Sequence, residues 1–93
     1  MTNEQITTIL SALKIDLGIT TTAYDSRLSQ IIQASAEAII SEGVSTFNPE
    51  VLGDAQLVIM YAAWTWRRRD SGIEMPRMLR YSLNCRIMKE KAR

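Results

Sequence analysis

Apolar residues recur every three or four positions along most of the chain, a spacing that predicts α-helices. Residues 44–48 could be extended, but no obvious second strand is available to pair with them, and we interpret them as a loop. We expect an all-α fold, a small bundle of about four helices at approximately 3–17, 22–42, 49–69 and 76–91. With 93 residues, the chain is expected to form a single domain, 1–93.

Local signals predict where the first two helices begin and end. Thr2 and Gln5 have the spacing of a capping box, and Gly18 is a natural end for the first helix. Thr22 and Asp25 have similar spacing and are expected to satisfy free backbone N–H groups at the start of the second helix.

The later helix boundaries depend on glycine and proline. Gly43 is expected to end the second helix. Asn48 followed by Pro49 predicts the start of the third, because asparagine caps well and proline at the first helical position loses no needed hydrogen bond. Pro76 predicts the start of the last helix in the same way.

The third and fourth predicted helices are apolar on two sides. The third carries one stripe expected in the core, and a second stripe at Leu57, Met60, Tyr61 and Trp64. The fourth carries opposed stripes, Leu79/Leu83/Ile87 on one side and Met78/Tyr81/Cys85/Met88 on the other. A small monomer cannot easily enclose such helices, so we expect the second stripe of each to form an interface with another subunit.

Trp64 and Trp66 lie two positions apart, so on a helix they point in nearly opposite directions. We expect Trp66 in the core and Trp64 at an interface. Cys85 lies on a Met-rich stripe and is interpreted as a small buried apolar residue rather than a reactive thiol.

Charge is divided unevenly along the chain. Nine of the eleven Lys and Arg residues follow Trp66, against three acids, so residues 67–93 carry +6 while residues 1–66 carry −5. The basic end could meet a nucleic acid, an acidic partner or the acidic end of another copy. Arg67, Arg68 and Arg69 have two open readings: a solvated cluster at a helix C-terminus, or contacts to phosphate or an acidic partner.

Few residues could support catalysis. The chain has no histidine, one cysteine, no Gly-rich phosphate loop and only scattered acids, so we expect no enzyme activity, metal site or cofactor. The longest uncharged stretch, 55–66, is too short to span a membrane, and the start of the chain does not have the pattern of a signal peptide. A single cysteine is compatible with a reducing cytoplasm.

Several short phrases resemble the head-tail connector family of tailed bacteriophages, also described as head completion or adaptor proteins. The matching phrases are Leu13-Lys14-Ile15-Asp16, the Ala-rich segment 28–40, the aromatic and basic run 61–69, Pro76 and the ending Ser82-Leu83 with Arg86. Two features differ: the family commonly has Arg-Glu where this chain has Arg67-Arg68-Arg69-Asp70, and its loop before the proline is often longer.

The resemblance implies a structural virion protein of the phage neck that assembles in the bacterial host cytoplasm as a ring, commonly of twelve copies. Such a ring lies under the portal, joins the head to the next tail-side adaptor or stopper protein, and helps to retain packaged DNA without sequence-specific binding. We expect the basic C-terminal end, about 86–93, to dock on the portal through Arg86, Lys89, Lys91 and Arg93.

Two alternatives remain open. A DNA-binding module could place Arg77, Arg80, Arg86 and Lys89 on phosphates, although these charges are spread around the predicted helix. The chain could also be a small helical oligomer that binds another protein partner.

Overall fold

Four helices make up the described part of the protein. The computed structural model describes residues 2–71 and 74–92, without the side chains of 69–71. The helices are α1 (Asn3–Leu17), α2 (Asp25–Ser41), α3 (Leu52–Ser71) and α4 (Arg77–Lys91). No residue in the described ranges belongs to a strand, and the prediction of a small all-α bundle is confirmed.

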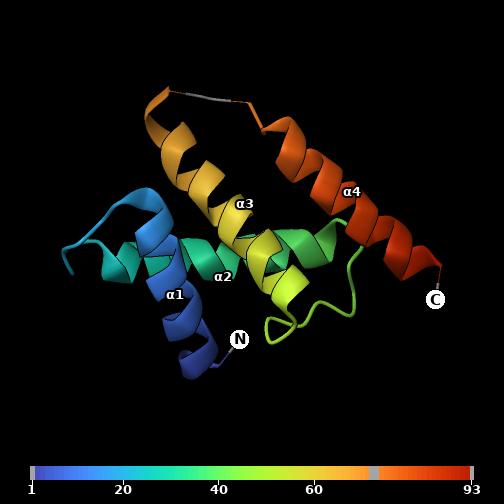
Figure 1. The fold of residues 1–93 in the computed structure, drawn as a ribbon, viewed down its shortest axis with the longest axis horizontal. Coiled ribbons are helices and arrows are strands. Elements are labelled where there is room, and N and C mark those ends of the chain that lie inside the picture. The colour runs from blue at the N-terminus through green and yellow to red at the C-terminus, as the bar shows by residue number, and fades with distance from the viewer. Residues whose placement is uncertain (1, 72–73, 93) are drawn as a thin grey trace.

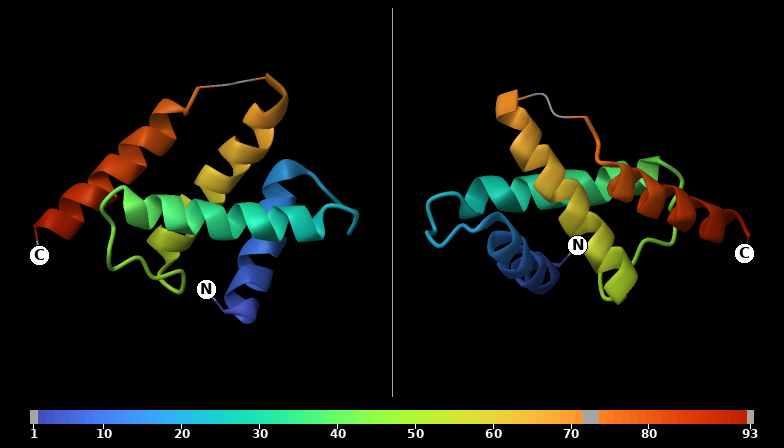
Figure 2. Two further views of the ribbon diagram at one scale, coloured as in Figure 1. Left: turned by 180° about the vertical axis from the view of Figure 1, so that it is seen from behind. Right: turned by 45° about the horizontal axis from the view of Figure 1, so that its top comes forward.

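The central helix is α3, which lies between α1 and α4 (Figure 1). It packs against each of the other three helices, and α2 crosses behind α1 and α3. The molecule measures 41 × 30 × 18 Å, and its thin dimension has room for only two layers of helices, each about 10–12 Å across. In both views of Figure 2, α4 lies at the edge of the molecule farthest from α1.

All four helices contribute to one hydrophobic core. Its largest fully enclosed apolar side chains are Leu13, Leu28, Ile32, Ile39, Val44, Val58, Leu79 and Leu83. Val44 is the loop member of this set, and Gly43 before it has φ of 124°, a conformation that residues with a Cβ rarely adopt. The glycine therefore lets the chain turn out of α2 and return Val44 to the core.

The predicted ends of α1 are confirmed, whereas the start of α2 is corrected. The backbone N–H of Gln5 donates to Thr2 Oγ1 (3.2 Å), Thr2 N–H donates to Gln5 Oε1 (2.9 Å), and Gly18 ends the helix with φ of 72°. The second helix starts at Asp25 rather than 22, without a side-chain cap. Instead of capping, the Asp25 carboxylate accepts a hydrogen bond from Lys14 Nζ at 2.8 Å and so ties α2 to α1.

The third helix also begins later than the expected residue 49. Asn48 Oδ1 accepts a hydrogen bond from the N–H of Glu50, and Asn48 O accepts one from Val51. These bonds close a turn at Asn48-Pro49 before the helix begins at Leu52. Val51 and Leu52 lie at the end of this turn and at the first helical position, and they are 51% and 74% exposed.

Leu57, expected in a subunit interface, is instead enclosed within the single chain. The three neighbours of α3 within the same chain enclose most of that helix, and Leu57 is only 4% exposed. Met60, Tyr61 and Trp64 are half-buried. Leu57 is therefore a core residue of the single chain, and the large exposed apolar side chains near the C-terminus lie on α4.

The inward face of α4 should contribute strongly to stability. Leu83→Ala removes a fully enclosed side chain and should lower the free energy of unfolding by about 2–5 kcal/mol. Met78→Ala, on the same helix but 70% exposed, is the matched control and should change it by less than about 1 kcal/mol. Urea denaturation followed by circular dichroism measures both, and equal losses would contradict the described packing of α4.

Candidate protein-interaction surface

The outward side of α4 is an apolar surface that no described residue covers. Met78, Tyr81 and Met88 are 70%, 60% and 69% exposed, and Cys85, expected to be buried, is exposed as well. We call these four residues the outer face of α4. They lie opposite Leu79 and Leu83, whose side chains fill the core.

This surface arises because α4 has apolar residues on two sides but packs against the bundle with only one. A single exposed apolar residue is ordinary, but four at helical spacing form a continuous patch. Arginine flanks the patch: Arg77, Arg80 and Cys85 line a shallow hollow of about 620 Å³ together with Met75, Tyr81, Asn84 and Met88. Among the residues that the structure describes, no acidic one lines this hollow.

Aromatic residues near the end of α3 are engaged within the chain. The rings of Tyr61 and Trp64 meet edge to face at 5.5 Å, and the guanidinium of Arg68 lies 4.4 Å from the centre of the Trp64 ring. Trp66 meets Tyr24 edge to face at 5.3 Å and is half-buried, as is Trp64. Both tryptophans therefore contribute to packing inside the protomer.

The arginine triplet does not form one described anion site. Arg68 lies against Trp64, whereas Arg67 Nη2 donates to the carbonyl oxygen of Asp16 at 3.4 Å. The side chain of Arg69 lies outside the described residues. The described contacts of Arg67 and Arg68 therefore point to separate packing roles in the chain.

An ion pair that was not expected from the sequence joins the buried Asp54 of α3 to the partly buried Arg86 of α4. Arg86 Nε donates to Asp54 Oδ1 at 2.8 Å, and Arg86 Nη2 donates to Asp54 Oδ2 at 3.4 Å. The two side chains are only 16% and 5% exposed. Asp54 Oδ2 also accepts from the N–H of Asn48 at 2.9 Å, so the carboxylate orders the turn before α3 as well. Such a geometry, with both oxygens engaged, satisfies most of the bonding capacity of a buried carboxylate.

A second set of bonds fixes the loop between α2 and α3 to α4. Glu90 Oε1 accepts hydrogen bonds from the N–H of Thr46 at 2.7 Å and from its hydroxyl at 2.6 Å. Ser45 Oγ donates to the same oxygen at 3.3 Å, and Arg86 Nη2 donates to Thr46 Oγ1 at 3.1 Å. The loop is thereby held between the start of α3 and the last turns of α4.

The hydrogen bonds with Asp54 raise the pKa of Arg86 above its ordinary value, while partial burial acts in the opposite direction. A cation with a raised pKa stabilises the fold at every pH below its ordinary pKa and loses that contribution only as the pH rises through the folded value. Arg86 therefore stays charged across the physiological range, and its deprotonation cannot act as a switch there.

The residues expected to dock on a portal differ in exposure and in their contacts within the chain. Arg86 is engaged inside the chain by its ion pair with Asp54, so its guanidinium is not available to the portal as expected. Lys89 and Lys91 are exposed in the last turn of α4, and Arg93 lies outside the described residues. A signal for the role of Arg86 was present, since it follows Leu83 by three positions and so falls beside the buried stripe.

Other classes of site find little support in the described part of the chain. Among residues 2–71 and 74–92, no group of three potential His, Cys, Asp or Glu ligands is placed to hold a metal ion. No described helix is long and apolar enough to cross a membrane.

Comparisons with protein-family models, with curated proteins and with solved structures found no match to this chain. Functional inference therefore depends on the geometry described above and on the resemblance in the sequence.

Removing one partner of the buried pair should destabilise the isolated chain. Asp54→Ala leaves the partly buried Arg86 guanidinium and the N–H of Asn48 without their acceptor, and should cost about 1.5–3 kcal/mol in the free energy of unfolding. Glu42→Ala, which breaks the exposed 3.5 Å pair with Arg80, is the control and should cost about 1 kcal/mol or less. Urea denaturation measures both, and equal costs would show that the buried pair is not a major link.

Proposed function

We propose that this chain is a non-enzymatic structural subunit of a phage neck, a head-tail connector that assembles as a ring beneath the portal. The observation that carries the proposal is the uncovered outer face of α4, an apolar patch flanked by basic residues. The resemblance in the sequence to the connector family supplies the context in which such a face would be covered by protein.

The composition of the face favours protein contact over DNA contact. Its centre consists of methionine, tyrosine and cysteine side chains. Their apolar area is removed from water only when another apolar surface covers it. Arg86, one of the four cations of the DNA-binding alternative, is directed into the pair with Asp54. A DNA backbone would leave the apolar centre of the patch without a partner.

In this proposal, Met78, Tyr81, Cys85 and Met88 lie in the subunit interface, and Tyr81 is its aromatic anchor. Lys89, Lys91 and Arg93 provide electrostatic contacts to an acidic surface of the portal. The opposite side of the ring meets the next tail-side protein, and packaged DNA passes through the channel without being read. The ring is proposed to have twelve copies and to reside in the virion neck.

A charge placed in the outer face should prevent assembly without unfolding the chain. Met88→Glu should retain its circular dichroism spectrum but no longer form annular particles with the portal from the same phage, because assembly would bury the new carboxylate. Negative-stain microscopy counts the particles. Ile40→Glu is the matched control: Ile40 is 45% exposed on α2, outside this face, and its variant should assemble normally.

The same preparations test the rival class. Strong retardation of duplex DNA at low salt, steeply lost as salt rises, together with no annular particles from the unaltered chain and portal, would replace the connector proposal with a DNA-binding one.

A further inference from the structure

A second hollow, on the other side of α3 from α4, has the opposite charge from the outer face. It lies between α1 and the start of α3 and has a volume of about 620 Å³. Ile9, Ala12 and Ile59 contribute apolar lining, and Leu52, 74% exposed, lies at its edge. Of the described residues that line it, Glu4 and Glu50 carry charge and none is basic. We call this hollow the α1–α3 groove.

The groove and the outer face of α4 are complementary in chemistry. One offers an apolar hollow with two carboxylates, and the other offers an apolar helix surface with Arg77 and Arg80 beside it. No ion pair between described residues engages the carboxylates of Glu4 or Glu50. The same complementarity exists on the scale of the whole chain, because residues 1–66 carry −5 and residues 67–93 carry +6.

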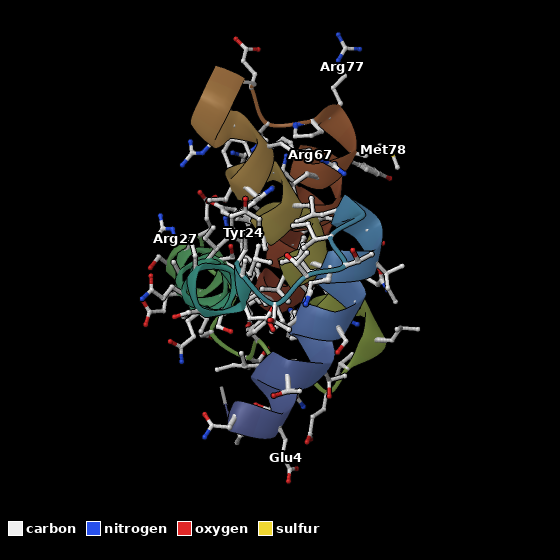
Figure 3. All side chains as sticks on the ribbon, turned by 90° about the vertical axis from the view of Figure 1, so that its left-hand side faces the viewer. Glu4, Tyr24, Arg27, Arg67, Arg77 and Met78 are labelled. Atoms are coloured by element: carbon white, nitrogen blue, oxygen red, sulfur yellow. The ribbon has the colours of Figure 1, made fainter. Side chains whose placement is uncertain are left out.

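The two surfaces of one molecule cannot meet each other. Figure 3 shows Glu4 and Arg77 at opposite ends of the molecule, each pointing away from its body. Figure 1 shows α1 and α4 on opposite sides of α3. If these surfaces bind, they must therefore bind across two molecules.

We propose that the outer face of α4 of one copy occupies the α1–α3 groove of the next copy. This inference rests on the assembly in the proposed function and names the surfaces that make it. The contact is head to tail, since each copy contributes two different surfaces to two neighbours. Repetition of this single contact builds a ring when the rotation between neighbours closes, and an open filament when it does not.

Cysteine cross-linking tests the contact, because Cys85 already lies on the outer face of α4. Thr8 lies on α1 and lines the groove. In Thr8→Cys each chain carries one thiol on each surface, so mild oxidation at high protein concentration should produce a ladder of dimers, trimers and longer disulfide-linked chains on a non-reducing gel. The unaltered chain, with Cys85 alone, can form dimers at most.

Thr7→Cys is the matched control. Thr7 is exposed on the same helix, donates its hydroxyl to a carbonyl four residues earlier as Thr8 does, and lies about 100° away around the helix, outside the groove lining. Species longer than dimers should be at least about tenfold less abundant for Thr7→Cys than for Thr8→Cys, because only the contact at the groove holds two thiols close together. An equal ladder from both variants, or no ladder from Thr8→Cys, would overturn the proposed contact.

Charge reversal adds a second readout on the Thr8→Cys background. Glu50→Arg alone and Arg77→Glu alone should each reduce the ladder, and the two together should restore part of it, because the pair is reversed rather than removed. If the double variant shows no recovery, Glu50 and Arg77 do not face each other in the contact, and the proposed charge pairing is wrong.

Failure of this inference can be distinguished from failure of the proposed function. Annular particles formed by the unaltered chain and portal, without a Thr8→Cys ladder, would preserve the connector proposal and reject the groove as the docking surface. A ladder without annular particles would preserve the head-to-tail contact and reject the connector proposal.

Discussion

The ion pair between Asp54 and Arg86 is the constraint on which the C-terminal half of this structure depends. It joins the first turn of α3 to the third turn of α4, and the same carboxylate holds the N–H of Asn48. Because Asp54 is buried and Arg86 is partly buried, losing the arginine would leave the buried carboxylate without its charged partner. The pair therefore fixes not only two helices but also the turn that leads into one of them.

The pair also determines which side of α4 is available to a partner. Arg86 and Glu90 hold one edge of the helix against α3 and the loop before it, while Leu79 and Leu83 fill the core beneath. With its rotation fixed in this way, α4 must present Met78, Tyr81 and Met88 outward. An interaction surface on a helix that is locked in rotation is preorganised, so that little conformational entropy is lost when a partner covers it.

Sequence patterns predicted the helices well where local chemistry decides the structure. The capping box at Thr2 and the glycine at 18 act within a few residues, and both were read correctly. The start of α3 was misplaced because the Asn48 side chain closes a preceding turn and Asp54 orders that turn through a contact shared with a distant helix. The burial of Leu57 within the chain was not predicted for a related reason. Three helices of the same chain surround α3, and the periodicity of apolar residues does not show how helices are arranged around one another.

Charged residues were the hardest to assign from sequence. Arg86 was grouped with Lys89 and Lys91 because all three are basic and close together, yet its side chain is 16% exposed and paired while theirs are in the exposed class. Arg86 and Asp54 lie 32 positions apart on different helices, and periodicity within each helix does not show that the two side chains meet. The outer face of α4, by contrast, was recognised from its spacing alone, because an apolar stripe opposite a buried one is a local property of the helix.

The sulfur content of the outer face has a consequence for its chemical lifetime. Two thioethers and one thiol lie on this exposed surface, and oxidants convert methionine to a polar sulfoxide and a thiol to sulfenic acid or a disulfide. Each such change replaces an apolar contact atom with a polar one, so an uncovered copy would lose its ability to bind as it ages in an oxidising medium. A partner that covers the face would protect these same atoms, and exposure time would then decide which copies remain competent.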